Sequence, residues 1–456
     1  MGKLFGTDGI RGVANQYPMT PEMAVTIGRA VAAIFKGDDK QSKIVIGKDT
    51  RISGDMLEYA LISGICSMGV DAYLTGVLPT PGVAFMTSSI GANAGIVISA
   101  SHNPYYDNGI KIFKVNGYKL SDEEESQIEK LVFNQSIALP SKSVRDTGRV
   151  YKIDDAVMAY GNFLKQTVSE SFCFKGIKIV MDCSNGATFE VAPAIFTQFG
   201  AKVTTLSVTP NGKNINDNCG SQHPENLKKI ILKNGAHIGL AFDGDGDRLI
   251  AVDEKGTVVT GDQILAVCAK FMKQKGLLKS NQVVSTVMSN MGLGQALKKI
   301  GIKHITTAVG DRYVMEKMVS SGAVLGGEDS GHMIFLNYHT TGDGILSALR
   351  LIEAMIEESK PLSELCKIMT IFPQVLINVN VVRKPDLKNI PNIKDAIKSV
   401  ERALGEKGRV VVRYSGTQPM CRIMVEGPTI NTTKKYCRQL ADVIKKNIGK
   451  RKEKRG

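Results

Sequence analysis

The sequence lacks several features that would place it in a specialised class of protein. No apolar run approaches the roughly 18 residues that suggest a membrane-spanning helix, and its start shows no basic-then-apolar secretory signal. Its eight cysteines form no CxxC pair, which argues against a zinc or redox motif. Several lie in apolar runs, where a reduced cysteine packs as a small hydrophobe. We therefore expect a cytoplasmic protein whose thiols are structural.

Acidic residues are outnumbered, but the basic excess does not have the pattern of a nucleic-acid platform. The net charge is +14, and the last twelve residues hold seven basic side chains against one acidic, a net +6. We expect the remainder to be dispersed, and aromatic residues do not interleave with the basic ones. The tail could contact nucleic acid, although a solvated chain end is the simpler interpretation. An excess of basic over acidic residues also suits a protein whose substrate carries phosphate.

Length and periodicity predict several α/β domains. A chain of 456 residues is too long for one hydrophobic core. Helix and strand signals alternate, with a helix start at Thr20-Pro21 and a capping box at Ser121 to Glu124, and this order indicates a largely parallel, layered sheet. In each of four units an apolar strand ends in a polar, glycine-containing loop. We place the domains at 1–150, 151–254, 255–370 and 371–456.

The first loop carries a candidate nucleophile. The β-branched run Gly95 to Ile98 reads as a buried strand that stops at Ser99-Ala100-Ser101-His102. Open α/β sheets bind ligands at the carboxyl ends of their strands, so Ser101 is well placed to react. The adjacent His102 adds a group for proton transfer. Lys48 and Arg51 add cations nearby, with surface charge as the alternative interpretation.

The second loop predicts a metal site. Asp243, Asp245 and Asp247 alternate with glycines, so three carboxylates can converge in one tight turn, as hard cations require. An EF-hand is the rival, because Glu254 stands at its twelfth position. However, Arg248 occupies the position where an EF-hand needs glycine, and the flanks read as strands. We therefore favour Mg²⁺, which binds carboxylates together with phosphate oxygens.

The third and fourth loops offer groups that suit a sugar phosphate. In the third loop, three polar residues alternate along what we expect to be an extended segment and so face one way: Glu328, Ser330 and His332. The fourth offers guanidinium groups, hydroxyls and an open backbone turn for a phosphate dianion: Arg413, Ser415, Gly416, Thr417 and Arg422.

These motifs together resemble the α-D-phosphohexomutases over essentially the whole chain. The motifs in question are GTDGIRG (6–12), SASHNPYYDNGIK (99–111), DGDGDR (243–248), GEDSGH (327–332) and RYSGT (413–417). The resemblance implies three related mixed-sheet α/β/α domains and a smaller C-terminal α+β domain around a central cleft. Residues 99–111, 219–221 and 309–314 are similar to those of members that act on glucosamine phosphates. In the phosphate loop, Tyr414 and Gln418 replace the usual proline and glutamate, and loss of the proline is expected to loosen the loop.

The resemblance also implies a mechanism. Ser101, as phosphoserine, would convert glucosamine 6-phosphate to glucosamine 1-phosphate through the 1,6-bisphosphate, on the route to UDP-N-acetylglucosamine. Mg²⁺ would be held by Ser101 and the three aspartates. Proton transfer and charge neutralisation would fall to His102, Lys111, Arg11 and His332. The implied substrate-binding residues are Arg248, Glu328, Ser330, His332, Arg413, Ser415, Gly416, Thr417 and Arg422.

Rival functions and partners stay open on the sequence alone. A phosphoglucomutase or phosphomannomutase would differ in few sugar-contacting residues, and a non-catalytic sugar-phosphate sensor is the alternative from another class. The expected partner is a hexosamine phosphate. The sequence leaves open whether Ser101 is first phosphorylated by a kinase, by the protein itself or from a sugar 1,6-bisphosphate. We expect neither nucleic acid nor membrane as a partner, and a monomer or homodimer. Reorientation of the intermediate requires a moving part, for which the last domain, entered through residues 370–373, is our candidate.

Overall fold

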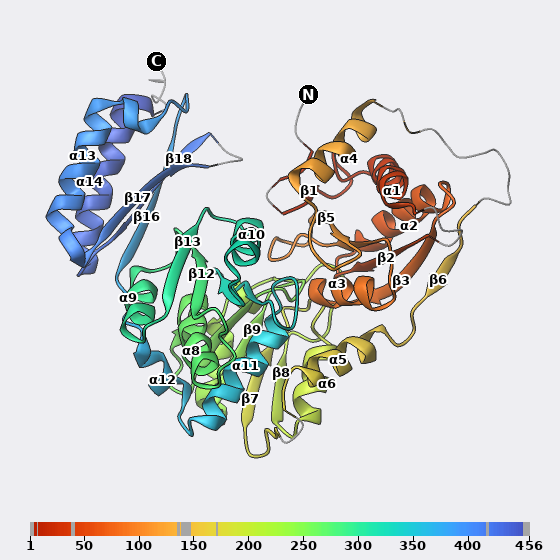
Figure 1. The fold of residues 1–456 in the computed structure, drawn as a ribbon, viewed down its shortest axis with the longest axis horizontal. Helices are drawn as coiled ribbons and strands as arrows, with labels where there is room; N and C mark the ends of the chain where they lie inside the picture. Colours follow the sequence, from red (N-terminus) through yellow and green to blue (C-terminus); the bar gives the residue numbers. More distant parts are fainter. Residues whose placement is uncertain are drawn as a thin grey trace.

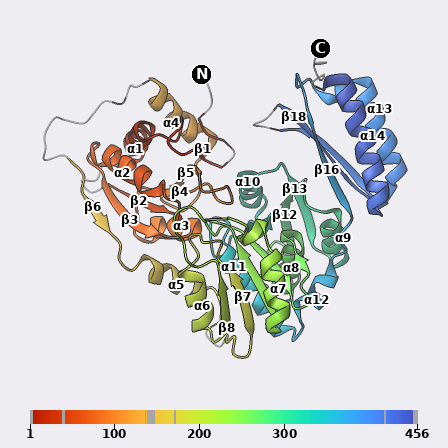
Figure 2. The ribbon, with the colours of Figure 1, turned by 180° about the vertical axis from the view of Figure 1, so that it is seen from behind.

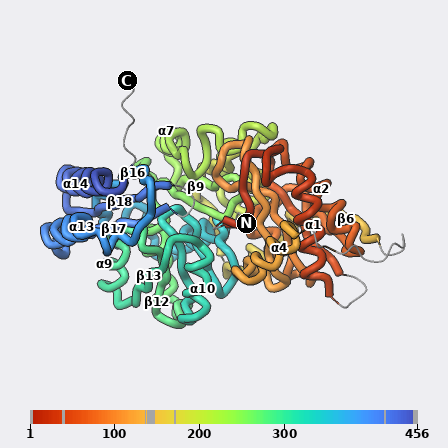
Figure 3. The backbone as a smooth tube through the Cα atoms, turned by 90° about the horizontal axis from the view of Figure 1, so that it is seen from above, coloured from red at the N-terminus to blue at the C-terminus, as the bar shows by residue number. Residues whose placement is uncertain are grey.

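Four sheets, each covered by helices, follow one another along the chain (Figure 1). They are seen in a computed structural model that describes residues 4–6, 8–37, 42–134, 137, 147–169, 172–415 and 419–449. Seen from above, the first and last domains lie at opposite ends of the molecule, with the other two between them (Figure 3). The predicted α/β fold class is confirmed. No helix in these ranges is long and apolar enough to cross a membrane.

The first sheet is mixed and has the order β1-β5-β4-β2-β3-β6. Its strands are β1 (Ile10–Val13), β2 (Lys43–Lys48), β3 (Asp71–Val77), β4 (Ala94–Ile98), β5 (Asp107–Lys114) and β6 (Val150–Lys152). The helices are α1 (Pro21–Phe35), α2 (Gly54–Cys66), α3 (Thr80–Ser89) and α4 (Asp122–Asn134). Both predicted helix starts are confirmed: the Thr20 side chain accepts from the Met23 amide, and Ser121 and Glu124 bond reciprocally.

The second and third sheets place two more strand ends beside the first. The second sheet, in the order β11-β10-β9-β7-β8, has strands β7 (Lys178–Asp182), β8 (Lys202–Leu206), β9 (Ile238–Phe242), β10 (Leu249–Asp253) and β11 (Val258–Val259). The third, in the order β13-β12-β14-β15, has strands β12 (Gln282–Thr286), β13 (Lys303–Thr307), β14 (Leu325–Gly327) and β15 (Met333–Phe335). Their helices (Figure 2) are α5 (Ala156–Gln166), α6 (Val191–Gln198), α7 (Glu225–Asn234), α8 (Gly261–Gln274), α9 (Met291–Lys299), α10 (Asp311–Ser321), α11 (Gly344–Glu357) and α12 (Leu362–Leu365).

The last domain is a three-stranded antiparallel sheet under two helices. Its strand order is β16-β18-β17, from β16 (Gln374–Asn380), β17 (Arg409–Tyr414) and β18 (Met420–Glu426). Helices α13 (Pro391–Leu404) and α14 (Ile430–Ile448) pack side by side against the sheet (Figures 1 and 2). Among the described residues, its hydrophobic core is separate from the one that joins the second and third domains.

The charge is concentrated in this last domain. Residues 371–456 contain 20 Lys and Arg against 7 Asp and Glu, so they hold +13 of the net charge of +14. The expectation that the excess outside the tail is dispersed is therefore wrong. Amphipathic α13 and α14 account for part of it, because their apolar faces cover the sheet and their polar faces carry lysine and arginine.

Candidate active site

Ser101 lies in a tightly held loop at the carboxyl end of β4. It is fully buried and has a positive φ of 53°, which a non-glycine residue adopts only when its surroundings hold it there. Its amide donates to the Ser99 hydroxyl (2.9 Å), which donates in turn to Asp49 (2.6 Å). Arg51 pairs with Asp49 and donates to the carbonyls of Ser101 and Asn103 at 2.9 and 2.8 Å. Arg51 is thus a buried loop anchor, and the surface-charge interpretation is wrong for it.

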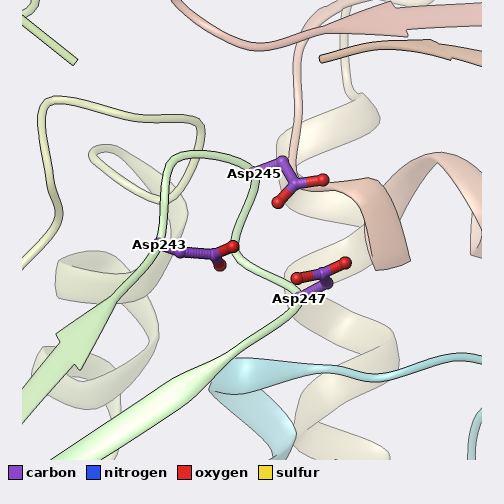
Figure 4. A group of neighbouring side chains, drawn as sticks. All are labelled: Asp243, Asp245 and Asp247. Atoms are coloured by element: carbon purple, nitrogen blue, oxygen red, sulfur yellow. The ribbon is translucent and has the colours of Figure 1, made fainter. Parts of the chain in front are cut away.

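The three predicted aspartates converge in the turn between β9 and β10 (Figure 4). All are buried, and one oxygen of each lies within 4.8 Å of the others. The Ser101 hydroxyl donates to Asp243 at 2.5 Å. Burial and the charges of Asp247 and Asp245 raise the pKa of Asp243 well above its ordinary value. Three carboxylates forced together at this distance favour a cation between them.

The donor set fits a hard divalent cation. One oxygen each of Asp245 and Asp247 is buried and has no hydrogen-bond partner among the described residues, as expected of atoms that ligate an ion. Their other oxygens accept from Lys111 Nζ at 2.7 and 3.2 Å, and Thr80 Oγ1 donates to Asp245 at 2.6 Å. The carboxylates are therefore positioned by hydrogen bonds on one side and left open on the other.

Two of the predicted catalytic side chains, Lys111 and His102, lie beside this centre. Lys111 also lies 3.2 Å from Asp8; burial lowers its pKa, but the carboxylates of Asp245, Asp247 and Asp8 outweigh burial and raise it. His102 Nδ1 lies 3.3 Å from Ser101 Oγ. Burial, with the nearby Arg248 and Arg11, lowers the pKa of His102 to about 4, so its imidazole is neutral at neutral pH.

Arg11 and Arg248 supply guanidinium groups beside the Ser101 segment and the aspartate turn. Arg11 Nη1 donates to the Ala100 carbonyl at 3.3 Å and pairs with Asp8. Arg248 Nε lies 3.7 Å from Asp247 and 4.0 Å from Asp243. Both arginines therefore face the carboxylates and the segment that carries Ser101.

His332 connects the metal loop to the third domain. Its Nδ1 lies 3.6 Å from Asp247 and its Nε2 3.7 Å from Asp311. Burial lowers the pKa of His332, but these two carboxylates outweigh burial and raise it above the ordinary value. His332 thus favours the protonated state more than His102 does, although both are imidazoles beside the same centre.

Sequence reasoning missed the network behind His332. Lys119 pairs with both Asp8 and Asp311, so it bridges the first and third domains. Lys119, Asp311 and His332 line a cavity of about 560 Å³ between these domains. The spacing in the sequence offered no signal for this network, because Lys119 lies 111 positions from Asp8 and 192 from Asp311.

The third loop is a tight turn and not the expected extended segment. Gly331 has a φ of 90°, and its amide donates to the Glu328 carbonyl at 3.0 Å, so the chain reverses between β14 and β15. The argument that alternation makes three side chains face one way is therefore wrong. Glu328 is held instead by the Gly310 amide at 3.1 Å. The Ser330 hydroxyl has no hydrogen-bond partner among the described residues.

The fourth loop begins where β17 and β18 pair Arg413 directly with Arg422. Burial and the charge of Arg422 lower the pKa of Arg413, with Glu328 opposing them. The Nε atom of each arginine is buried and has no hydrogen-bond partner within the described ranges. Two adjacent guanidinium groups with unused hydrogen-bond donors are suited to binding an anion. Gly416, Thr417 and Gln418 lie outside the described residues.

The flanks of this fourth loop are anchored within the last domain. The Ser415 amide donates to Met420 at 2.9 Å, and its carbonyl accepts from Lys384 at 2.7 Å. Tyr414, which stands where proline is usual, donates its hydroxyl to the Pro385 carbonyl at 2.7 Å. The tyrosine thus supplies a tether at the position where the ring constraint of proline is missing.

Comparisons with known proteins agree with this arrangement. Models of the phosphoglucomutase/phosphomannomutase family match in order: α/β/α domain I at residues 2–138, domain II at 159–256, domain III at 260–372 and the C-terminal domain at 376–443. Proteins named phosphoglucosamine mutase from Syntrophus aciditrophicus and Syntrophobacter fumaroxidans are 60% and 59% identical; each match covers 98% of this chain and 100% of the relative.

Solved structures share the fold at low sequence identity. A phosphoglucomutase/phosphomannomutase family protein from Burkholderia thailandensis aligns with a TM-score of 0.81 at 23% identity, covering 98% of this chain and 99% of that one. Aspergillus fumigatus N-acetylphosphoglucosamine mutase, solved with GlcNAc-6P and magnesium, aligns at 0.67 and 16% identity, covering 97% and 95%. With four family domains in order and full-length relatives at 60% identity, this chain belongs to the phosphoglucosamine mutases of the phosphoglucomutase/phosphomannomutase family.

Proposed function

We propose that this chain is an isomerase that interconverts glucosamine 6-phosphate and glucosamine 1-phosphate, with Ser101 as the carrier of the phosphoryl group. The observation that carries the proposal is the Ser101 hydroxyl itself, held in a strained loop and bonded to one of three converging carboxylates. Relatives 60% and 59% identical over their full length bear the name of this activity. The product would enter the route to UDP-N-acetylglucosamine.

In the forward reaction, a hydroxyl of the bound sugar attacks phosphoserine 101. A P–O bond forms to the sugar while the bond to Ser101 Oγ breaks, and the hydroxyl proton passes to a base; the product is the 1,6-bisphosphate. After the intermediate reorients, Ser101 takes back the other phosphate. The two half-reactions balance, so the enzyme ends phosphorylated as it began.

The residues around Ser101 have complementary roles in this proposal. Lys111 and Arg11 supply positive charge beside the transferring group. His102, within 3.3 Å of Ser101 Oγ, and His332 are the candidates for moving the proton. Asp243, Asp245 and Asp247, with a phosphate oxygen of Ser101, would hold Mg²⁺. When bound, the ion offsets charge on the phosphoryl group.

Substrate recognition would come from the other domains. Glu328 and Ser330 face the sugar in this proposal, with Arg248 and His332 between them and the metal loop. The phosphate that is not being transferred would bind the positively charged end of the β17–β18 hairpin, at Arg413, Ser415, Gly416, Thr417 and Arg422. The solved fungal relative contains GlcNAc-6P and magnesium, which supports a hexosamine phosphate as the substrate class.

The decisive experiment removes the phosphate carrier. We expect Ser101→Ala to abolish conversion of glucosamine 6-phosphate, while Ser63→Ala, at an exposed serine on α2, leaves it unchanged. Phosphopeptide mapping of the active enzyme should find phosphate on Ser101. Normal turnover by Ser101→Ala would refute the proposal.

Substrate choice requires its own comparison. We expect kcat/KM for glucosamine 6-phosphate to exceed that for glucose 6-phosphate and mannose 6-phosphate. The reverse order would assign a phosphoglucomutase or phosphomannomutase, and no turnover with any of the three would favour a sugar-phosphate sensor. We further propose a cytoplasmic monomer or homodimer. Its Ser101 is first phosphorylated by a kinase, by the protein itself or from a sugar 1,6-bisphosphate. Incubating the protein with labelled phosphate donors, with and without a kinase, would distinguish these routes.

A further inference from the structure

One face of the last sheet carries two pairs of charged residues at its opposite ends. In the β17–β18 ladder, Arg409 lies opposite Glu426 and Arg413 lies opposite Arg422. Residues four apart in a strand lie on the same face. Alternate residues of both strands pack into the domain's own core, so these four side chains lie on the face turned away from α13 and α14. About 13 Å of strand separates the two pairs.

The pair of Arg409 and Glu426 contacts the third domain. Glu426 is fully buried, although it lies on the face away from its own helices. Arg409 Nε donates to Glu426 Oε2 at 2.6 Å, and the Met291 amide at the start of α9 donates to the same oxygen at 3.0 Å. The Arg409 guanidinium also donates to the Ser289 carbonyl. An ion pair of the last domain, with a fully buried carboxylate and a partly buried arginine, is therefore completed by the backbone of the third domain.

The chain crosses between the two domains at the same place. The Asn290 side chain donates to the Phe372 carbonyl at 2.9 Å and accepts from the Phe372 amide at 3.0 Å. A Cβ on Gly292 would lie 1.9 Å from the Thr370 carbonyl oxygen, so the first turn of α9 is in close contact with the crossing segment. Residues 289–292 thus hold both the crossing segment and one end of the β17–β18 hairpin.

We infer that Arg409 and Glu426 are positioning residues: their pair is the pivot about which the last domain turns, and it sets where Arg413 and Arg422 stand relative to Ser101. The inference rests on the proposed function. Because the hairpin is hydrogen-bonded along its length, a change at the pivot displaces the guanidinium groups at its other end. The separate core of the last domain allows it to move as one body.

A loosened pivot has a defined chemical consequence. During reorientation the two phosphates of the 1,6-bisphosphate exchange places, so Arg413 and Arg422 must release one phosphate and capture the other before the intermediate leaves the protein. When these guanidinium groups are misplaced, the intermediate dissociates before the second transfer and leaves Ser101 without phosphate. Turnover then depends on added 1,6-bisphosphate, although the first phosphoryl transfer is intact.

The test compares Glu426→Gln and Arg409→Lys with Glu401→Gln, a control at an exposed position on α13. We expect release of labelled bisphosphate per turnover to rise about tenfold in both pivot variants, because the conformational step and not the first transfer is affected. In single turnover from phosphoserine at saturating substrate, the first transfer should stay within about twofold of the parent. The control should match the parent in both.

Small-angle scattering of the same proteins gives a readout that does not require activity. We expect a larger radius of gyration for Glu426→Gln and Arg409→Lys than for the parent and the control. Where Glu426→Gln does not fold, Glu426→Asp keeps the charge and shifts the pivot. Parent-like scattering and bisphosphate release in the folded variants would overturn the pivot, whereas absence of turnover in the parent would overturn the proposed function instead.

Discussion

Ser101 depends on a buried ion pair for its position. Asp49 and Arg51 have fully buried side chains, and Arg51 donates to the carbonyls of four residues of the loop, Ser101, Asn103, Pro104 and Asp107. A planar guanidinium suits this task because its five donors diverge in fixed directions. Ser101, the proposed reacting residue, is therefore positioned by Asp49 and Arg51, which have no part in the proposed phosphoryl transfer.

We predict that Arg51→Lys lowers kcat by about 100-fold, since misplacement of a reacting group has effects of this size. An ammonium cannot reach Asp49 and the loop carbonyls together. Breaking a buried pair should also destabilise the fold by about 3 kcal/mol. Steady-state kinetics and urea unfolding check both effects, with Arg29→Lys, a partly buried arginine on α1, as the control. Parent-like kcat in Arg51→Lys would contradict the anchoring role.

The open carboxylate oxygens make a separate prediction about metal. Chelation should abolish turnover and Mg²⁺ should restore it. Asp245→Asn and Asp247→Asn should each raise the Mg²⁺ concentration needed for half-maximal activity by at least about tenfold, because an amide is a weaker, uncharged ligand. Titration calorimetry with Mg²⁺ alone checks the affinity. Asp217→Asn, at an exposed aspartate, serves as the control; equal Mg²⁺ dependence in all three variants would exclude the site.

At the scale of elements, histidine and threonine contacts fasten the third domain to the first. His339 Nε2 bonds to the Pro81 carbonyl on α3 at 2.9 Å, and its Nδ1 accepts from the Thr340 amide at 2.8 Å. Thr340 donates to the Gly117 carbonyl at 2.7 Å. Because one ring nitrogen of His339 must accept, the contact requires the neutral imidazole.

This contact predicts a loss of stability in acid. Burial lowers the pKa of His339 to about 4, below its ordinary value of 6.5. The neutral His339 side chain therefore contributes fully to the free energy of unfolding above pH 6.5, and this contribution is lost as the pH falls from 6.5 to about 4. A pKa difference of this size corresponds to about 3 kcal/mol. His339→Gln lacks the titration, so the gap in unfolding free energy between parent and variant should narrow over this range in urea titrations. A constant gap would contradict the prediction.

Positive charge is distributed unevenly over the whole molecule. Residues 371–456 hold +13 of the net +14, and the same domain carries Arg413 and Arg422. A substrate with a phosphate dianion is attracted to such a domain at long range, and this attraction raises the association rate more than the rate of chemistry.

We therefore predict that kcat/KM falls as ionic strength rises. Lys434→Glu with Lys435→Glu, on the exposed face of α14, should lower kcat/KM several-fold at low salt and leave kcat unchanged. Lys229→Glu with Lys233→Glu, at exposed positions on α7, makes the same charge change in the second domain and should lower kcat/KM less. Equal effects of the two pairs would show that only net charge matters.

Sequence was informative wherever the chemistry is local. The strand before Ser101, the alternation of Asp243, Asp245 and Asp247 with glycine, and the helix caps at Thr20 and Ser121 all depend on residues within a few positions of one another. Recognition of the family extended this to whole-chain architecture and activity. The extended third loop was the local prediction that failed, because alternation does not reveal the positive φ of Gly331.

By itself, then, the sequence determined which reactive groups exist and that each follows a strand. Tertiary structure decided which of them meet: the Ser101–Asp243 contact joins residues 142 apart, and Lys119 reaches Asp311 across 192 residues. It also decided that Arg51 is buried and that the pKa of His102 falls while that of His332 rises. The physical reason is that burial and charge at each group come largely from residues distant in the sequence, some of them in other domains, which no local pattern records.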